Sequence, residues 1–408
     1  MSLKSYEGVL MQFPEYRALK NLMLYVPPVL IVLGTFGNVF SFIIMRRRAM
    51  LKVSSYHYLA SLAVADSLVL YIGLLRLWLG EVTGSDFHNS ADWICKLTIS
   101  LGYTASDLSV WLIIAVTVER YIVVCFPLRA SAMINTNRAK KVIGFLVLLM
   151  FTINLHFFWT VEIVERQPVD GNNVSNCEAA PHHQQLVNAV WPWVDACIYS
   201  FVPFIVILVL NILIVIEVIE ARAHRLRMQS TSEHHYHRQA SRFRGTAGSS
   251  FSLHNVDIGS CRRACGPGEG MKLTIMLLTV SFAFLLTTLP MNISLIVTAF
   301  WDHSNNDLRR VVQFKLANTV AELLMYLNHS MNFCLYCATG QKFRQQIVHL
   351  LRCRRDNYSA WNSLHTDDTK CTSSLKNGIH SVKLLVHQAP ELVINHNGEI
   401  VLPSATKL

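Results

Sequence analysis

Seven apolar stretches run through this chain, and each is long enough to cross a lipid bilayer as a helix. The hydrocarbon core of a bilayer is about 30 Å thick, which roughly 20 helical residues span. In lipid the backbone polar groups must be bonded within the protein, and a helix bonds them within one segment. The sequence therefore predicts an all-α bundle of seven transmembrane helices. The predicted spans are Leu22–Met45, Tyr56–Leu79, Ile94–Cys125, Val142–Ile163, Trp193–Ile219, Leu273–Phe300 and Val311–Cys337.

The composition agrees with a membrane protein, since 52% of the residues are hydrophobic and only 15% are charged. Soluble domains have about 25% charged residues. The formal net charge is +10, but the basic residues lie beside the spans, where anionic lipid headgroups attract them. Membrane lipid is thus an expected partner, and nucleic acid is not.

Basic residues also predict the orientation. They follow the first, third and fifth spans, for example at Arg46, Arg138 and Arg222, whereas the alternate loops are acidic or neutral. Cytoplasmic loops carry the excess of Lys and Arg. We therefore expect a plasma-membrane protein with residues 1–21 extracellular and the carboxyl terminus cytoplasmic. No cleavable signal peptide is expected before the first span, since its flanking residues are polar and mixed in charge.

The predicted seven-helix domain covers residues 22–340, and three segments within it or after it are predicted to differ from the spans. Residues 221–271 are polar and predict a flexible cytoplasmic loop. Residues 341–352 have apolar side chains at helical spacing between basic ones, which indicates an amphipathic interfacial helix, and residues 353–408 predict a disordered tail. Cys353 is either a palmitoylation site or a plain cytosolic thiol. Asn173 begins an Asn-Val-Ser acceptor for an N-glycan.

Several polar residues lie inside the spans, where they are costly and indicate function. Asp66, Ser109, Asn328 and Asn332 would together offer a carboxylate, a hydroxyl and two amides. Such a set is a plausible oxygen cage for a sodium ion, and it is equally a hydrogen-bond network that holds helices together. No other cofactor is expected.

Glu119, Arg120 and Tyr121 stand together at the inner end of the third span. The Glu119 carboxylate offers Arg120 a partner in the resting state. Release of that pair would free the guanidinium for a partner protein.

These residues belong to an ordered set of motifs that resembles the rhodopsin-like G-protein-coupled receptors over residues 22 to about 352. The motifs, in order, are Gly37-Asn38, Leu62 to Asp66, Glu119-Arg120-Tyr121, Pro203, Phe284 with Pro290, and Asn332 to Tyr336.

The resemblance implies seven antiparallel helices, an extracellular ligand pocket and a cytoplasmic cleft that opens to a heterotrimeric G protein. It also implies a Cys95–Cys177 disulfide, arrestin binding through the tail, and no enzyme activity. Four features depart from the family pattern: the fourth span lacks its usual Trp, Thr287 to Pro290 replaces Cys-Trp-x-Pro, Phe333 replaces a Pro, and Asn211 replaces a Tyr. The switch role is assigned to Phe284, Pro290, Asn332 and Tyr336, together with Glu119, Arg120 and Tyr121.

Two classes of ligand, amines and retinal, do not fit the sequence. Receptors for amines have an acid where this chain has Gly102, and retinal proteins have a lysine where it has Tyr326. The remaining pattern resembles invertebrate-type neuropeptide receptors. The alternatives are a receptor for a non-peptide ligand, or a seven-helix transporter or channel.

Acids within the spans suggest the charge of the ligand, because buried carboxylates need a partner. Arg76 is expected to pair with Glu322, which would leave Asp107 and Asp195 for an Arg or Lys of a peptide. The alternative for Asp107 is a protonated carboxyl hydrogen-bonded between helices. The predicted ligand-binding residues are Arg76, Gly102, Tyr103, Asp107, Trp193, Asp195, Glu322 and Tyr326.

Overall fold

The structure, a computed structural model, describes residues 8–166, 174–244, 269–299, 308–350, 393–394 and 400–401. The chain divides into two units, residues 1–346 and 347–408. In the second unit, strand β3 (Val393–Ile394) pairs antiparallel with strand β4 (Ile400–Val401). All that follows concerns the first unit.

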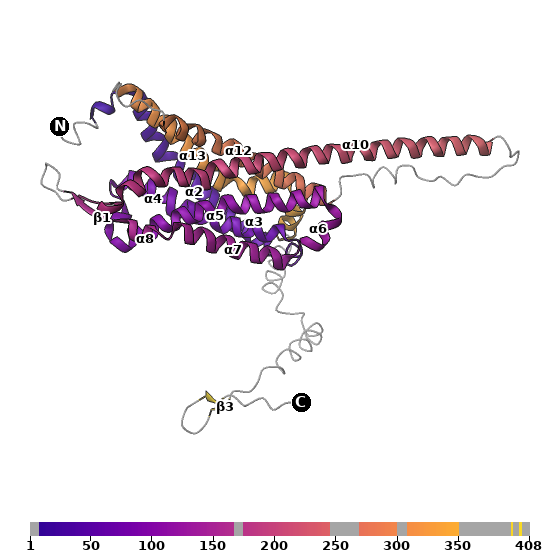
Figure 1. Ribbon diagram of the computed structural model, residues 1–408, viewed down its shortest axis with the longest axis horizontal. Helices are drawn as coiled ribbons and strands as arrows, with labels where there is room; N and C mark the ends of the chain where they lie inside the picture. The colour runs from indigo at the N-terminus through magenta and orange to yellow at the C-terminus, as the bar shows by residue number, and fades with distance from the viewer. Residues whose placement is uncertain are drawn as a thin grey trace, which may run out of the picture. The chain divides into compact units, whose positions relative to one another are not determined.

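Helices make up nearly all of the first unit. The long helices run side by side in Figure 1. Two of them are built from consecutive α and π segments. The segments are α2 (Pro14–Met45); α3 (Ser55–Val69), the π segment η1 (Leu70–Leu74) and α4 (Leu75–Thr83); the 3-10 turn η2 (Phe87–Ser90); α5 (Asp92–Cys125); α6 (Pro127–Met133); α7 (Thr136–Asn154) and α8 (Phe157–Thr160); the 3-10 turn η3 (Pro181–His183); the π segment η4 (Leu186–Val190), α9 (Trp191–Asp195), the π segment η5 (Ala196–Phe201) and α10 (Val202–Arg244); α12 (Glu269–Ala299); and α13 (Leu308–Thr339), after which residues 341–350 are helical.

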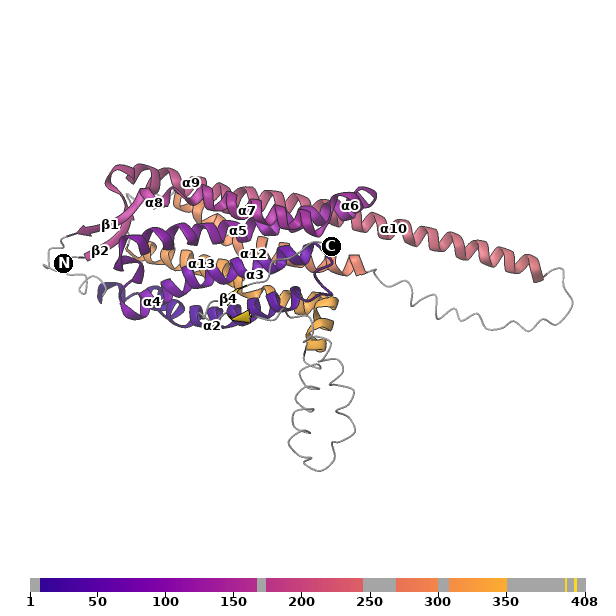
Figure 2. The same ribbon diagram turned by 90° about the horizontal axis from the view of Figure 1, so that it is seen from below.

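The long helices form a closed bundle. Helix α2 packs against α3 and α13, α3 against α5, α5 against α7 and α10, α10 against α12, and α12 against α13 (Figure 2). Six helical stretches within the described residues are long and apolar enough to cross a membrane. Helix α13 completes the ring with a similar length but more polar side chains, of which Asn328, His329, Ser330 and Asn332 are buried. We call the two ends of the bundle the disulfide end, where Cys95 lies, and the arginine end, where Arg120 lies.

Several boundaries differ from those predicted. Helix α2 begins at Pro14, inside the segment predicted as the amino terminus. Helix α10 continues to Arg244, through much of the loop predicted over 221–271, because no Gly or Pro follows Pro203 until Gly245. The fourth span ends early, since residues 161–163 of its predicted range belong to a β-strand.

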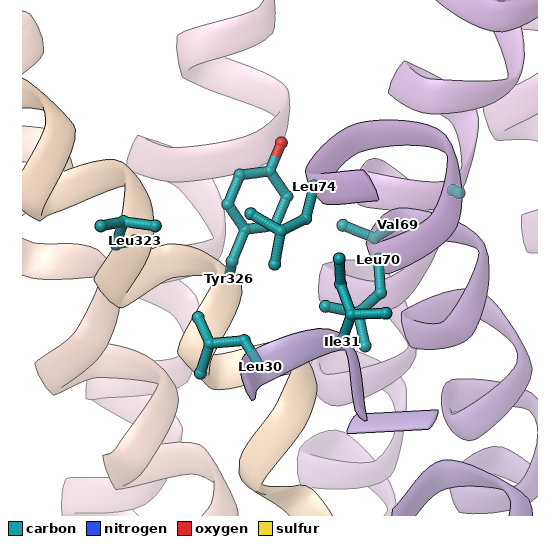
Figure 3. Packing of buried hydrophobic residues seen from close by; sticks show 8 residues of the cluster. Leu30, Ile31, Val69, Leu70, Leu74, Leu323 and Tyr326 are labelled. Carbon is teal, nitrogen blue, oxygen red and sulfur yellow. The ribbon is translucent and has the colours of Figure 1, made fainter. Parts of the chain in front are cut away.

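The apolar core toward the disulfide end is formed by α2, α3, η1, α5 and α13. Figure 3 shows seven of its eight buried side chains labelled, gathered from segments far apart in the sequence. Burial of each leucine or isoleucine is worth about 1.5–3 kcal/mol in water, but in lipid close packing carries more of the stabilisation. This cluster contains Leu30, Ile31, Val69, Leu70, Leu74, Ala105, Leu323 and Tyr326.

A side chain of α4 compensates a proline in α2. Pro28 has no N–H, so the carbonyl of Leu24, four residues earlier, has no helical donor. The indole Nε1–H of Trp78 donates to that carbonyl oxygen at 3.0 Å. The bond satisfies a backbone group that lipid could not, and it joins α2 to α4.

Candidate functional site

A cavity of about 310 Å³ lies toward the disulfide end of the bundle. Arg76 and Asp195 are the two charged side chains that line it, among apolar and hydroxyl-bearing neighbours. The sequence-predicted residues Gly102, Tyr103 and Tyr326 also line it, while Tyr199, Ser106 and Ser200 line it without having been predicted. A volume of this size and mixed chemistry is typical of a ligand site.

A β-hairpin and a disulfide lie at the same end. Strand β1 (Val161–Arg166) pairs antiparallel with β2 (Val174–Ala179), with Ile163 opposite Cys177. Cys177 is bonded to Cys95 at the start of α5, with 5.7 Å between the two Cα atoms. The Cys177 backbone N–H also donates to Asn89 Oδ1 at 2.9 Å. The pair implied by the family resemblance is therefore present, and it ties the hairpin to α5.

Arg76 is held by residues between α4 and α5. Its Nη1 lies 3.4 Å from Asp86 Oδ2, and Asp86 Oδ1 lies 2.7 Å from His88 Nδ1. The ion pair that Arg76 makes within 4 Å is with Asp86 and not with the predicted Glu322, because the turn after α4 brings Asp86 close to the guanidinium. Glu322 is half-buried on α13 and does not line the cavity.

Asp107 faces α7 rather than the cavity. Its Oδ2 accepts a hydrogen bond of 2.8 Å from Asn154 Nδ2, and both residues are buried. The backbone oxygen of Asn154 accepts from Ser100 Oγ at 3.2 Å. This is the interhelical hydrogen bond of the second alternative for Asp107, and it leaves Asp195 as the acid that lines the cavity.

Trp191 of α9, and not the predicted Trp193, packs inside the bundle. Trp193 is 54% exposed and lies outside the cavity lining, whereas Trp191 is 8% exposed. The Trp191 ring packs against Tyr103 and Phe157, with centroids 6.4 and 5.4 Å away. Positions two apart on a helix point to different sides, so only one of the pair can face α5.

A buried polar cluster lies deeper in the bundle, centred on Asp66. Its Oδ1 accepts from Ser109 Oγ at 2.6 Å and lies 2.8 Å from His329 Nδ1. Its Oδ2 accepts from Asn332 Nδ2 at 2.7 Å. Asn328 is buried too, but no hydrogen bond links it to Asp66. The sequence reasoning did not include His329, although an intramembrane histidine was itself a signal.

Arg120 is buried at the arginine end with two partners. Its Nη2 lies 3.1 Å from Glu119 Oε1 and also donates to Ser55 Oγ. Ser55 in turn donates to Glu119 Oε1, so the three side chains form a closed triangle between α3 and α5. Ser55 was not predicted, because a serine at a helix start is usually read as a cap.

The other predicted switch residues lie on α5, α12 and α13. Tyr121 packs edge-on against Phe126 at 5.8 Å, and Tyr336 against Phe343 at 5.5 Å. Phe284 is fully buried in α12. Near Pro290, the hydroxyl of Thr288 donates to the Phe284 carbonyl at 2.8 Å. Asn332 is the one switch residue that also contacts Asp66.

Two predicted modification sites, Asn173 and Cys353, lie outside the described residues. The predicted tail over 353–408 is described only at its two short strands.

Sequence comparison gives the class that this fold and these clusters define. The family described as 7 transmembrane receptor (rhodopsin family) matches residues 37–336, so the chain belongs to that receptor family. It is an integral membrane receptor and not an enzyme, transporter or channel.

Three receptors are similar in sequence to this chain over more than three quarters of its length. The chain is 26% identical to growth hormone secretagogue receptor type 1 of Rattus norvegicus over 328 residues, covering 79% of this chain and 78% of that protein. The human receptor of the same name is 26% identical over 330 residues, with the same coverage. The FMRFamide receptor of Drosophila melanogaster is 26% identical over 325 residues, covering 77% of this chain and 51% of the relative.

Proposed function

We propose that this receptor binds a peptide with a basic residue, which pairs with Asp195, and that binding opens the arginine end to a heterotrimeric G protein. The observation that carries the proposal is the charge of the cavity: Asp195 is its acidic lining residue, while Asp107 is bonded to Asn154. The relatives' names, FMRFamide receptor among them, support a peptide ligand.

The second charged lining residue limits what else the ligand carries. Arg76 lines the cavity, and its Nη1 lies 3.4 Å from Asp86 Oδ2 and 3.3 Å from His88 Nε2. A guanidinium fixed in this way suits an acceptor group of the ligand, such as a peptide carbonyl. The aromatic rings of Tyr103 and Tyr326 would then contact apolar side chains of the peptide.

The orientation belongs to the same proposal. Arg46, Arg47 and Arg48 follow α2 at the arginine end, and Arg138 begins α7 there. Basic residues gather on the cytoplasmic side. The disulfide end would then be extracellular, with the amino terminus outside, and the arginine end would meet the G protein.

Four further parts of the function rest on the sequence and stay proposals: plasma-membrane location, a glycan at Asn173, palmitoylation at Cys353, and arrestin binding through the tail. The amphipathic sequence over 341–352 would contact membrane lipid, since Lys342 and Arg344 alternate with apolar side chains.

The test is a panel of synthetic peptides applied to cells that express the chain, with calcium and cyclic nucleotide as readouts. Each basic peptide is paired with a copy in which citrulline or norleucine replaces the basic residue. We expect only the basic member of an active pair to signal. Activation by a ligand with no basic group would contradict the charge assignment.

A substitution at Asp195 tests whether this residue contacts the basic group of the peptide. Asp195→Ala should cost an active peptide roughly 2–5 kcal/mol of binding free energy if a desolvated charge pair is broken. Neutralising the peptide's basic residue should then cause little further loss in that variant. Additive losses would show that the two groups do not pair.

A further inference from the structure

The Asp66 carboxylate is surrounded by donors from two other helices. Ser109 of α5 and His329 of α13 both meet Oδ1, at 2.6 and 2.8 Å, and Asn332 of α13 meets Oδ2 at 2.7 Å. Both Asp66 and His329 are fully buried. A carboxylate has about four lone-pair positions, so these three contacts use most of its capacity.

His329 is fixed at both its backbone and its ring. Its carbonyl oxygen accepts from Asn38 Nδ2 of α2 at 3.1 Å. Its Nδ1 lies 3.4 Å from Ser109 Oγ as well as 2.8 Å from Asp66. An ionised carboxylate only accepts hydrogen bonds, so the contact requires the hydrogen on Nδ1. The ring therefore points at Asp66 as a donor.

These contacts fit a sodium ion poorly. Hard cations take oxygen ligands, and several of them must converge on the ion. Here Ser109 turns its hydroxyl hydrogen and Asn332 its amide nitrogen toward Asp66, so both face the carboxylate as donors. The imidazole ring of His329 lies beside Asp66 Oδ1, the carboxylate oxygen that Ser109 also contacts. A cation at Asp66 would have to displace His329 from a packed interior.

Some oxygens in this region do remain available. The amide oxygens of Asn38, Asn328 and Asn332 have no hydrogen-bond partner among the described residues. They are uncharged, and an ordered water satisfies such groups. They do not replace the carboxylate, whose oxygens the three donors contact.

We infer that the His329 imidazole occupies the place at Asp66 that a sodium ion would need, and that this receptor has no sodium-dependent resting state. The sequence motifs alone leave a sodium cage and a hydrogen-bond network equally open, and the Asp66–His329 contact selects the network. The inference does not depend on the identity of the ligand.

The experiment needs no ligand. The purified full-length receptor is heated in sodium chloride and in choline chloride of equal ionic strength, and Tm is compared. We expect the same Tm for the native protein in both salts. His329→Ser replaces the imidazole ring with a hydroxyl oxygen, so the Tm of this variant should rise by about 2–4 °C in sodium chloride relative to choline chloride. Asp66→Asn added to His329→Ser should remove that gain.

A control separates this effect from the loss of any buried histidine. His57 is buried at the arginine end, where its Nε2 meets the Leu51 carbonyl at 3.1 Å. His57→Ser should show no difference between the salts.

Two results would overturn the inference. One is a sodium-specific rise in the native protein that Asp66→Asn removes, a measurement that decides the matter even if His329→Ser does not fold. The other is a folded His329→Ser variant with no sodium-specific gain, because His329 would then not be the residue that keeps sodium out.

Discussion

Asn154 of α7 donates from Nδ2 to Oδ2 of Asp107 in α5 at 2.8 Å, inside the bundle. The bond holds Asp107 in the contact between α5 and α7, whereas Asp195 lines the cavity. Two carboxylates that look alike in the sequence thus have different roles, and mutation should separate them.

Asn154→Ala should lower the stability of the receptor, because it leaves the buried Asp107 carboxyl without its donor. The loss should be about 1–3 kcal/mol in the free energy of unfolding, measured as a fall in Tm. Thr152→Ala is the control, since the exposed Thr152 hydroxyl bonds only the Leu148 carbonyl of its own helix. Equal Tm values for Asn154→Ala and the native protein would contradict the assignment.

Gly73→Ala should strain the cavity wall. A Cβ on Gly73 would lie 2.7 Å from Tyr326 Oη, and such overpacking costs about 1–3 kcal/mol. Removing that oxygen in Gly73→Ala/Tyr326→Phe should recover most of the Tm. Gly144→Ala, where a Cβ would meet nothing within 4 Å, should be harmless. A double variant no better than Gly73→Ala would show that the clash is elsewhere.

Trp78→Phe should destabilise the contact between α2 and α4. The variant keeps an aromatic ring but leaves the Leu24 carbonyl, freed by Pro28, without its donor at a cost of about 1–3 kcal/mol. The matched variant is Trp93→Phe, at a position that is 67% exposed. Both proteins are compared by Tm, and similar values would argue against the bond.

Ser55→Ala should raise signalling without ligand. The hydroxyl bridges Glu119 and Arg120, so its loss weakens the resting arrangement of the arginine. A charge-assisted hydrogen bond worth about 1.5–3 kcal/mol changes a two-state ratio by on the order of tenfold or more. Basal cyclic nucleotide and calcium are measured, with Ser67→Ala as the control because Ser67 bonds only the Ala63 carbonyl. Unchanged basal signalling in Ser55→Ala would remove Ser55 from the switch.

Cys95→Ser should unfold the hairpin end and lower surface expression. The bond joins residues 82 positions apart, for which the chain-entropy model gives about 4 kcal/mol. Cys197→Ser is the comparison, since Cys197 is an exposed free cysteine. Labelling of Cys177 by a thiol reagent in the native protein would show that the pair is not formed.

The sequence predicts the helices of this receptor better than it predicts their partners. Apolar length alone locates the long helices, because a span must bond its own backbone in lipid. It also predicts that Asp66 and Arg120 have partners. It does not predict that Asp86 rather than Glu322 holds Arg76, since that depends on how the turn after α4 folds back.

The same limit applies to the smaller donors. Ser55, Asn154 and His329 each contact a buried carboxyl group that lies on a different helix. Helical spacing predicts which residues share one face of a helix. It does not predict which residues of a neighbouring helix that face contacts. Trp191 and Trp193 show how strongly a prediction depends on the exact position along a helix. The side chain of Trp191 is buried, whereas that of Trp193, two residues later, is exposed.

The π segment over Leu70–Leu74 affects how residues of related receptors are matched to this one. Such a segment closes its turn with one residue more than an α-turn, so every later side chain is rotated by about 100° relative to an uninterrupted helix. Counting forward from Asp66 along a relative without this insertion would therefore assign the wrong residue to the place of Arg76. An alignment with a relative that lacks this π turn therefore needs a one-residue gap here before any ligand contact is transferred across it.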